Sequence, residues 1–339
     1  MTGPVAGIDG NFIVRYSEFH SNSTIISAVS TGLMSGSRLI HRRVVASGRF
    51  AITQPEVSTG WVVWDQCPYP GPGWSVKAYS RATGRTHTVV AGKTGGYDRT
   101  NCTPHMTESD LYGNRIVVAG VTWVNVVTLP GLRTHRLFTL QKGQCPPTVV
   151  LASHIQIVVH RRWRSACAAS TIVARDTRTG AQRSIRIPAH IAFFESNGRT
   201  LIWLNDLHDK HDREYGSDLK GLRLWHGREF TLGRVGRGWS TACRAPWNHR
   251  IDVCIDGWNV QLSSRLLIWS TSGPTCCKEI IARDLKTGRT QVLRTLNVAH
   301  TPVVAVAPFT GTTVSWQVCF AASPQGPLHC FLEVSKVRF

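Results

Sequence analysis

Short apolar runs alternate with polar turns along the whole chain, and one such unit returns in three close copies. The copies are Val76–Gly84 (VKAYSRATG), Ile172–Gly180 (IVARDTRTG) and Ile280–Gly288 (IIARDLKTG). Each copy begins with apolar or small residues, as in a strand that is buried on both faces, and ends with polar residues and a glycine. The unit therefore predicts a buried strand followed by a tight turn.

The copy at Ile172–Gly180 indicates how the turn forms. Gly180 can supply a left-handed backbone conformation that other residues adopt only with strain. Asp176 is placed to accept hydrogen bonds from the amides of the turn. Beyond the turn, polar and apolar residues alternate over Gln182–Ile187, as in a half-exposed outer strand. The whole unit is predicted to be a β-hairpin.

Apolar runs that precede these hairpins complete a four-stranded pattern of inner, second, third and outer strand. The candidate second strands are Gly60–Trp64, Ile116–Ala119, Ile155–Val159, Leu201–Leu204, Leu266–Trp269 and Thr313–Trp316. Tryptophan recurs in them, and Trp64, Trp203, Trp269 and Trp316 are predicted to pack between sheets. One sheet cannot bury both of its apolar faces alone, so the repeats are expected to stack on one another.

The spacing of the turn glycines predicts the architecture. Weaker copies of the hairpin end at Gly32, Gly131 and Gly227, and successive turn glycines lie 47 to 61 residues apart. A period of about 40–50 residues in a β-rich chain is typical of a β-propeller. We predict an all-β fold, a seven-bladed β-propeller of four-stranded antiparallel blades with an incomplete last blade. Residues 1–339 are expected to form one domain, with approximate blades at 1–46, 47–92, 93–141, 142–188, 189–234, 235–296 and 297–339.

The second-strand apolar run and the Asp-x-x-Thr-Gly turn together resemble the repeats of TolB-like (WD40-like) propellers. The best example is Ser264–Leu293 (SRLLIWSTSGPTCCKEIIARDLKTGRTQVL). The resemblance extends over about seven repeats and thus most of the chain. It implies the propeller fold, and it carries no catalytic residue over to this sequence.

The cysteines and the lack of a long apolar run bear on where the protein acts. No apolar run approaches the about 20 residues of a membrane-spanning helix, and Met1–Gly10 lacks the features of a secretory signal. The 10 cysteines are not in metal-site spacing, and in the predicted fold most fall in loops on one face. We expect disulfides there, and hence an extracellular or envelope location with the signal segment missing from this chain. The expected pairs are Cys67 with Cys102, Cys145 with Cys167, Cys243 with Cys254 and Cys319 with Cys330, leaving Cys276 and Cys277 as a vicinal bridge or alternates.

The chain is strongly basic, with a formal net charge of +19 and a pI of about 10.2. Such a charge favours anionic partners, including anionic polymers. The basic residues are scattered over all repeats, however, and His160–Arg164 (HRRWR) is the one compact run. Nucleic acid is therefore the less favoured partner, because a denser stripe with interleaved aromatic residues is typical of its binding surfaces.

The predicted topology separates a face of short Thr-Gly turns from an opposite face that carries the long insertions, here called the long-loop face. Function usually resides in loops held by a rigid scaffold. We expect contacts to a polar or glycan ligand from aromatic, cationic and titratable residues on this face. The candidates are Tyr69, His105, Arg162, Trp163, His208, Asp209, His211, Trp239 and Trp247.

Motifs for catalysis and for cofactors are missing from the sequence. There is no G-x-S-x-G, P-loop or G-x-G-x-x-G segment. The stretch Asp206–Asp218 is rich in Asp and His and could hold a divalent cation. Its spacing fits neither an EF-hand loop nor a His-Glu-x-x-His motif, so a solvated loop is the favoured interpretation. We expect no cofactor and no resident metal.

Two functions follow from these observations. The first is a secreted or envelope-associated, non-catalytic propeller that binds a protein partner or a glycan through its long-loop face. The second is a carbohydrate-active hydrolase or lyase that uses His and carboxylate residues on the same face. The sequence favours the binding protein, and the carbohydrate-active enzyme stays the alternative.

Overall fold

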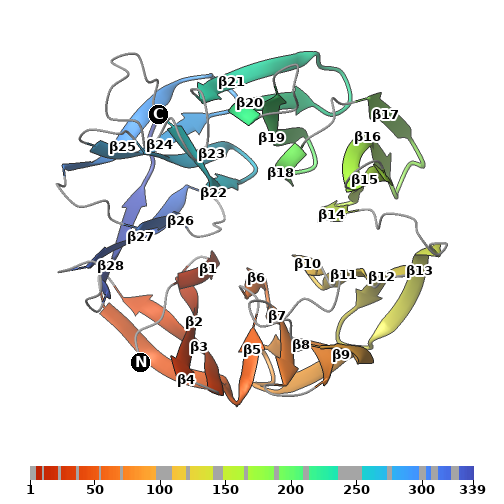
Figure 1. Ribbon diagram of the computed structural model, residues 1–339, viewed down its shortest axis with the longest axis vertical. Coiled ribbons are helices and arrows are strands. Elements are labelled where there is room, and N and C mark those ends of the chain that lie inside the picture. Colours follow the sequence, from red (N-terminus) through yellow and green to blue (C-terminus); the bar gives the residue numbers. More distant parts are fainter. Residues whose placement is uncertain are drawn as a thin grey trace. The chain divides into compact units, whose positions relative to one another are not determined.

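The computed structural model of the chain consists of antiparallel β-sheets joined by turns and loops (Figure 1). It describes residues 5–9, 11–21, 24–35, 38–52, 55–68, 72–96, 109–119, 123–139, 148–163, 167–186, 191–208, 214–235, 254–272, 277–297, 303–306, 312–321 and 328–339. The chain divides into two compact units, Met1–Ile185 and Arg186–Phe339. Within the described residues, no helix is long and apolar enough to cross a membrane.

The first unit holds four sheets, each built from strands that are consecutive in the chain. The first sheet comprises β1 (Val5–Asp9), β2 (Phe12–Ser21), β3 (Thr24–Ser35) and β4 (Arg38–Gly48). The second comprises β5 (Phe50–Ile52), β6 (Glu56–Ser58), β7 (Trp61–Pro68), β8 (Pro72–Ser80) and β9 (Thr86–Gly96). The third comprises β10 (Ser109–Tyr112), β11 (Arg115–Ala119), β12 (Trp123–Thr128) and β13 (Arg133–Thr139). The fourth comprises β14 (Thr148–Ala152), β15 (Ile155–Trp163), β16 (Cys167–Asp176) and β17 (Gln182–Arg186).

The second unit holds three sheets of the same design. The first comprises β18 (Ile191–Ser196), β19 (Thr200–His208), β20 (Glu214–Arg223) and β21 (Glu229–Val235). The next comprises β22 (Cys254–Leu262), β23 (Leu266–Ser272), β24 (Cys277–Asp284) and β25 (Thr290–Asn297). The last comprises only β26 (Val303–Val306), β27 (Thr313–Ala321) and β28 (Leu328–Lys336).

The number of blades corrects the sequence-based expectation. Six sheets have at least the four strands of a propeller blade, and β26–β28 form a small additional sheet of three. The fold is therefore an all-β propeller with six blades and an extra sheet, and the prediction of seven blades was wrong. The periodic spacing counts hairpins, and it does not show whether the last hairpin pattern supplies a full set of four strands.

One backbone hydrogen bond recurs at the same place in the repeats. The residue that follows the third strand donates its N–H to the carbonyl in the turn between the first and second strands, at 2.7–2.9 Å. The pairs are Arg81 to Gly60, Leu129 to Asn114, Thr177 to His154, Leu224 to Arg199, Leu285 to Arg265 and Val337 to Thr312. In these six sheets the bond joins the two hairpin turns at one end of the sheet, and it aligns equivalent residues of different sheets.

Packing between consecutive sheets buries both faces of the second strands, as the sequence predicts. On β7, Val62 and Trp64 pack with residues of the first sheet, whereas Trp61 and Val63 pack with residues of the third. In the second unit, Leu267 packs toward β19 and β20, and Ile268 packs toward β27. Trp64, Trp203, Trp269 and Trp316 are all buried, which confirms their predicted place in the core.

Gly32 does not have its predicted role as a turn residue. It lies within β3, opposite Ile13 of β2. A Cβ atom at this position would lie only 2.7 Å from Cδ1 of Leu39 on the adjacent strand β4. The glycine is thus explained by the close approach of a side chain and not by a turn. Gly84, Gly180 and Gly288 do take left-handed conformations, with φ of 67°, 77° and 75°.

The structure tests the predicted disulfides only in part. Cys67 is buried in β7 and is disulfide-bonded, and Cys102, its expected partner, lies outside the described residues. Cys319 and Cys330 lie directly opposite each other in the register of β27 and β28. Opposed residues of antiparallel strands have Cα atoms about 4.5–5.5 Å apart, a separation that a disulfide can bridge. The pairings themselves stay predictions, and Cys145, Cys243 and Cys276 also lie outside the described residues.

Candidate functional site

The ligand-binding residues predicted from the sequence fall mostly outside the described structure. This holds for Tyr69, His105, Asp209, His211, Trp239 and Trp247. Arg162 and Trp163 end strand β15, where they are paired with Ala168 and Cys167. His208 ends strand β19, opposite Glu214. The structure thus places three of the nine residues at the tips of second-to-third hairpins, and it does not test whether the nine share one site.

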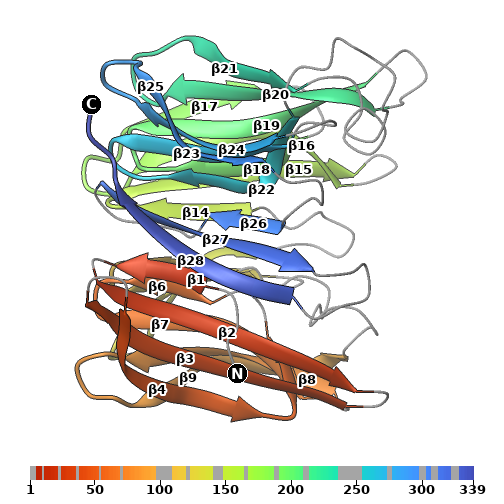
Figure 2. The ribbon, with the colours of Figure 1, turned by 90° about the vertical axis from the view of Figure 1, so that its left-hand side faces the viewer.

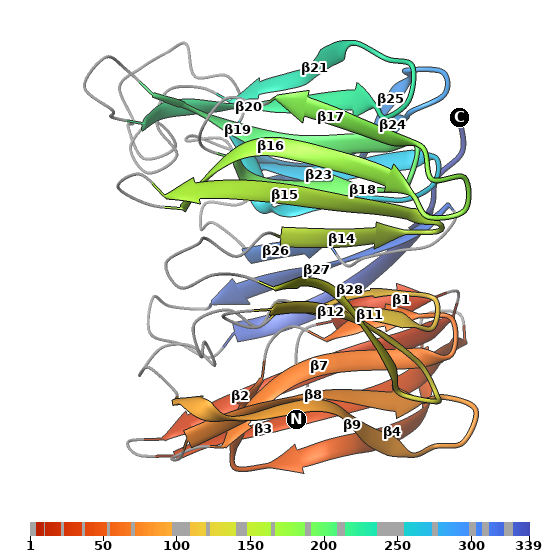
Figure 3. The same cartoon turned by 90° about the vertical axis from the view of Figure 1, so that its right-hand side faces the viewer.

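These hairpins project beyond the inner strands of their sheets. The β14–β15 pairing ends at Thr148 and Val159, whereas the β15–β16 pairing continues to Trp163 and Cys167. The β2–β3 pairing likewise continues to Ser21 and Thr24, far past the last pair of β1 with β2. The projecting ends lie at the opposite end of each sheet from the Thr-Gly turns, as the fourth sheet shows (Figure 3).

The proposed cation site is also only partly described. Asp206 and Asp218 lie on the paired strands β19 and β20, opposite Ser217 and Asn205. Residues 209–213 between these strands lie outside the described part. Among the described residues, no group of three or more His, Cys, Asp and Glu side chains is placed to share a metal ion.

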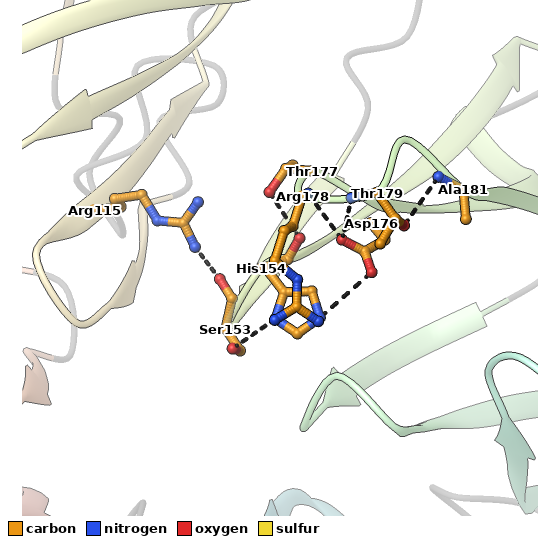
Figure 4. A network of polar contacts seen from close by, with 8 residues as sticks. All are labelled: Arg115, Ser153, His154, Asp176, Thr177, Arg178, Thr179 and Ala181. Atoms are coloured by element: carbon orange, nitrogen blue, oxygen red, sulfur yellow. Dashed lines mark hydrogen bonds and ion pairs between the residues drawn. The ribbon is translucent and has the colours of Figure 1, made fainter.

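The best-defined polar network lies on the short-turn side of the fourth sheet and was not predicted as a site (Figure 4). Ser153 and His154 form the two-residue turn between β14 and β15, and Ser153 has a left-handed φ of 59°. The Ser153 hydroxyl Oγ lies 3.1 Å from His154 Nδ1. His154 Nε2 lies 3.4 Å from Asp176 Oδ2, and Arg115 of the preceding sheet donates to the Ser153 carbonyl. Serine, histidine and aspartate are therefore linked in that order.

Asp176 also stabilises its own turn. Its Oδ1 accepts hydrogen bonds from the backbone N–H groups of Arg178 at 2.8 Å and Thr179 at 3.1 Å. The sequence predicted this role, and the structure confirms it. Burial opposes the charge of the carboxylate, but the bonds from Arg178 and Thr179 and the neighbouring His154 outweigh it, so the pKa of Asp176 lies below its usual value.

The equivalent turn between β24 and β25 shows what this network does. Oδ1 of Asp284 accepts from the N–H groups of Lys286 and Thr287, and its Oδ2 accepts from the guanidinium of Arg265. Arg265 occupies the place of His154, because each accepts the recurring backbone bond from the residue after the aspartate. In both sheets a side chain from the turn between the first and second strands therefore contacts the carboxylate of the turn that follows the third strand.

The Ser153–His154–Asp176 chain has the residue types of a hydrolytic triad, but its geometry favours turn stabilisation. Ser153 contacts Nδ1 and the aspartate contacts Nε2, and the serine adjoins the histidine in the sequence. Both carboxylate oxygens of Asp176 already serve the turn and the histidine. The Arg265–Asp284 pair does the same work without a serine or a histidine. We therefore assign a structural role to this network.

The low pKa of Asp176 predicts an acid-sensitive turn. A carboxyl whose pKa is lower in the folded state adds stability above its unfolded pKa, about 3.9, and that stability is lost as the pH falls through the folded value. We expect the urea midpoint of unfolding to depend less on pH below about 4 in Asp176→Asn than in the wild type. Ser153→Ala leaves the carboxylate in place, so its urea midpoint should depend on pH as steeply as that of the wild type. Equal slopes for Asp176→Asn and the wild type would contradict the assignment.

Comparison with known proteins supports the fold alone. No protein family model matches the sequence, and no curated protein matches it. Among solved structures, the propeller domain of the Trilobed protease from Pyrococcus furiosus is similar with a TM-score of 0.63 and 8% identity, over 99% of this chain and 96% of that one. A post-proline cleaving enzyme from Rickettsia typhi gives a TM-score of 0.60 and 10% identity, over 100% of this chain and 53% of the enzyme. TolB from Acinetobacter baumannii is similar at 9% identity with a TM-score of 0.47, over 80% of this chain and 60% of TolB.

These similarities define the class of the protein. The chain is a β-propeller with structural similarity to TolB and to the propeller domains of prolyl-oligopeptidase-type enzymes, which confirms the predicted TolB-like resemblance. It spans almost all of one isolated propeller domain but only about half of the whole post-proline cleaving enzyme. Identities of 8–10% carry no inference about activity.

Proposed function

We propose that this protein is a secreted or envelope-associated, non-catalytic β-propeller that binds a protein partner or a glycan through its long-loop face. The observation that carries the proposal is the extension of the second-to-third hairpins past the inner strands, seen at β2–β3, β15–β16 and β19–β20. A rigid stack of sheets that holds projecting hairpins at one end is the usual arrangement of a binding scaffold.

The residue types at these tips suit a polar or anionic ligand. Arg162 and Trp163 end β15, and His208 ends β19. Tryptophan and arginine are the residues that most often carry binding energy in protein interfaces, and a tryptophan ring also stacks on the C–H face of a sugar. The net charge of +19 further favours an acidic partner or an anionic glycan.

A binding screen of the wild type against a glycan array and immobilised heparin tests this proposal. We expect Arg162→Ala combined with Trp163→Ala, and separately Trp239→Ala combined with Trp247→Ala and His208→Ala, to weaken the observed binding at least about tenfold. The matched control combines Arg85→Ala, Arg178→Ala and Lys286→Ala at the short turns and should keep wild-type binding. Loss of binding in the control alone would assign the ligand to the opposite face, and turnover of a bound glycan would instead support the hydrolase.

A further inference from the structure

Two tryptophans and an arginine lie together between the second and third sheets of the first unit. Trp74 lies near the start of β8, which pairs with β9 in the second sheet (Figure 2), and Trp123 begins β12 of the third sheet. Both residues lie toward the end of their strand that is away from the short turn, and therefore at the long-loop end. Their ring centroids are 6.4 Å apart, and the ring planes are inclined by 35°.

The backbone of β9 makes room for the Trp74 ring. Gly92 is paired with Trp74, and a Cβ atom at this glycine would lie only 2.5 Å from Nε1 and Cε2 of the indole. The ring therefore lies directly against the β9 backbone, at a distance that glycine permits. Trp74 and Trp123 are both partly exposed, unlike the buried tryptophans of the second strands. Part of their aromatic surface thus reaches solvent.

Arg136 of β13 is held beside Trp123 by a buried side chain. Its Nε donates to Asn125 Oδ1 at 2.8 Å, and Asn125 is only 7% exposed. Its guanidinium Cζ lies 5.9 Å from the Trp123 ring centroid, within the range of a cation–π contact. The Arg136 side chain is exposed, and within the described part of the chain it has no ion pair. Its Nη groups therefore stay available for the oxygens of a carboxylate or sulfate.

The polar side-chain groups of this site are mainly hydrogen-bond donors, which favours a sugar over a peptide. The indoles and the guanidinium have no acceptor, and Asn125 Oδ1 already takes the bond from Arg136. A peptide strand would bring backbone N–H groups that these side chains cannot satisfy. An acidic sugar brings oxygen acceptors instead, and the C–H face of its ring matches the flat apolar surface of an indole.

We propose that Trp74, Trp123 and Arg136 bind an acidic sugar residue of an anionic glycan. The carboxylate or sulfate of the sugar lies on the Arg136 guanidinium, and the sugar ring lies against an indole. This inference rests on the proposed function, because it names the class of glycan and adds a binding site at the long-loop end. The net charge of +19 attracts anionic polymers in general, whereas these three side chains select the acidic sugar.

Calorimetric titration with oligosaccharides of defined length tests the proposal. The probes are a heparin octasaccharide, which carries sulfate and carboxylate groups, and an octagalacturonate, which carries carboxylates alone. Maltooctaose is the neutral control. We expect saturable binding of at least one acidic probe and none of maltooctaose. Binding of both acidic probes identifies the carboxylate as sufficient, and binding of the heparin fragment alone identifies the sulfate. Equal binding of maltooctaose would overturn the proposal.

Two matched substitutions on β13 separate this site from general charge attraction. Arg136→Gln and Arg133→Gln each remove one positive charge from an exposed arginine, but Arg133 is paired with Thr128 beside the short turn. We expect Arg136→Gln to weaken binding of the acidic probe at least about tenfold, because it removes charge-assisted hydrogen bonds. Arg133→Gln should leave the affinity within about twofold of the wild type. Equal losses would show attraction to the net charge alone and would refute the site.

Gly92→Ala tests the aromatic part without changing the charge. The added methyl group displaces the Trp74 ring, so we expect binding to weaken at least about threefold. Acidic-glycan binding that is lost in Arg162→Ala combined with Trp163→Ala, but unchanged in Arg136→Gln and Gly92→Ala, would overturn this inference and leave the proposed function intact. No binding of either acidic probe would also overturn it, whereas a protein partner could still bind the long-loop face.

Discussion

Trp203→Ala is expected to lower the free energy of unfolding by about 3–5 kcal/mol. Trp203 is only 1% exposed on the second strand β19, and its removal leaves a cavity between packed sheets that cannot fully collapse. Urea denaturation followed by far-UV circular dichroism measures the loss. A change below about 1 kcal/mol would show that β19 is not packed as described.

Trp203→Phe is the control that separates the ring from its polar group. The indole N–H of Trp203 is buried and has no hydrogen-bond partner among the described residues. Phenylalanine removes this unsatisfied donor, so it should recover most of the stability lost in the alanine variant. Trp64→Phe makes a useful contrast. Trp64 is equally buried, but its N–H donates a hydrogen bond to Gln66 Oε1 at 3.1 Å. Trp64→Phe removes this bond, so it should lower the free energy of unfolding by about 1 kcal/mol more than Trp203→Phe does.

Asp284→Ala is expected to destabilise the protein by about 2–3 kcal/mol, the typical cost of losing hydrogen bonds to a buried charged group. The carboxylate is buried and accepts bonds from the N–H groups of Lys286 and Thr287 and from the Arg265 guanidinium. Burial opposes its charge, but the Arg265 bond and the two backbone bonds outweigh this, and the pKa of Asp284 lies below its usual value. The charged form is therefore the one that the fold stabilises.

Arg265→Ala separates the ion pair from the turn. The Arg265 side chain is 49% exposed, so its partnership with Asp284 is partly screened by water and contributes less than the backbone bonds. We expect its loss to cost less than half of what Asp284→Ala costs, measured by the same urea titration. Equal costs for the two variants would mean that the salt bridge, and not the capped turn, is the main contribution of Asp284.

Much of the local structure follows from the order of residues alone. The strands β7, β11, β15, β19, β23 and β27 contain the predicted apolar runs, since a strand buried on both faces needs an unbroken run. The turns at Gly84, Gly180 and Gly288 were predicted because a left-handed residue and a capping side chain leave a short, readable signature. The prediction of a turn at Gly32 was wrong. A glycine also suits a strand position that a neighbouring side chain approaches closely, and the sequence does not show which side chain that is.

The polar network shows what local patterns leave out. The sequence assigned Asp176 to its turn, but His154 lies 22 residues earlier in the chain and reaches that carboxylate because Ile155 and Asp176 are opposed in the register of β15 and β16. The Ser-His pair just before an apolar run was the available signal. Its meaning depended on a strand pairing that only the folded sheet defines.

The sequence by itself determined the all-β class, the hairpin repeat and the chemistry of the Asp-x-x-Thr-Gly turns, because each depends on residues close together in the chain. The tertiary structure decided the number of complete blades, the side-chain partners of Asp176 and Asp284, and the cover over each sheet face. These features depend on which strands pair and which faces meet. Val334 and Ala282 are both predicted as strand residues. Val334 is 44% exposed, whereas Ala282 is buried because it packs in one core cluster with Val314 and Trp316 of the next sheet.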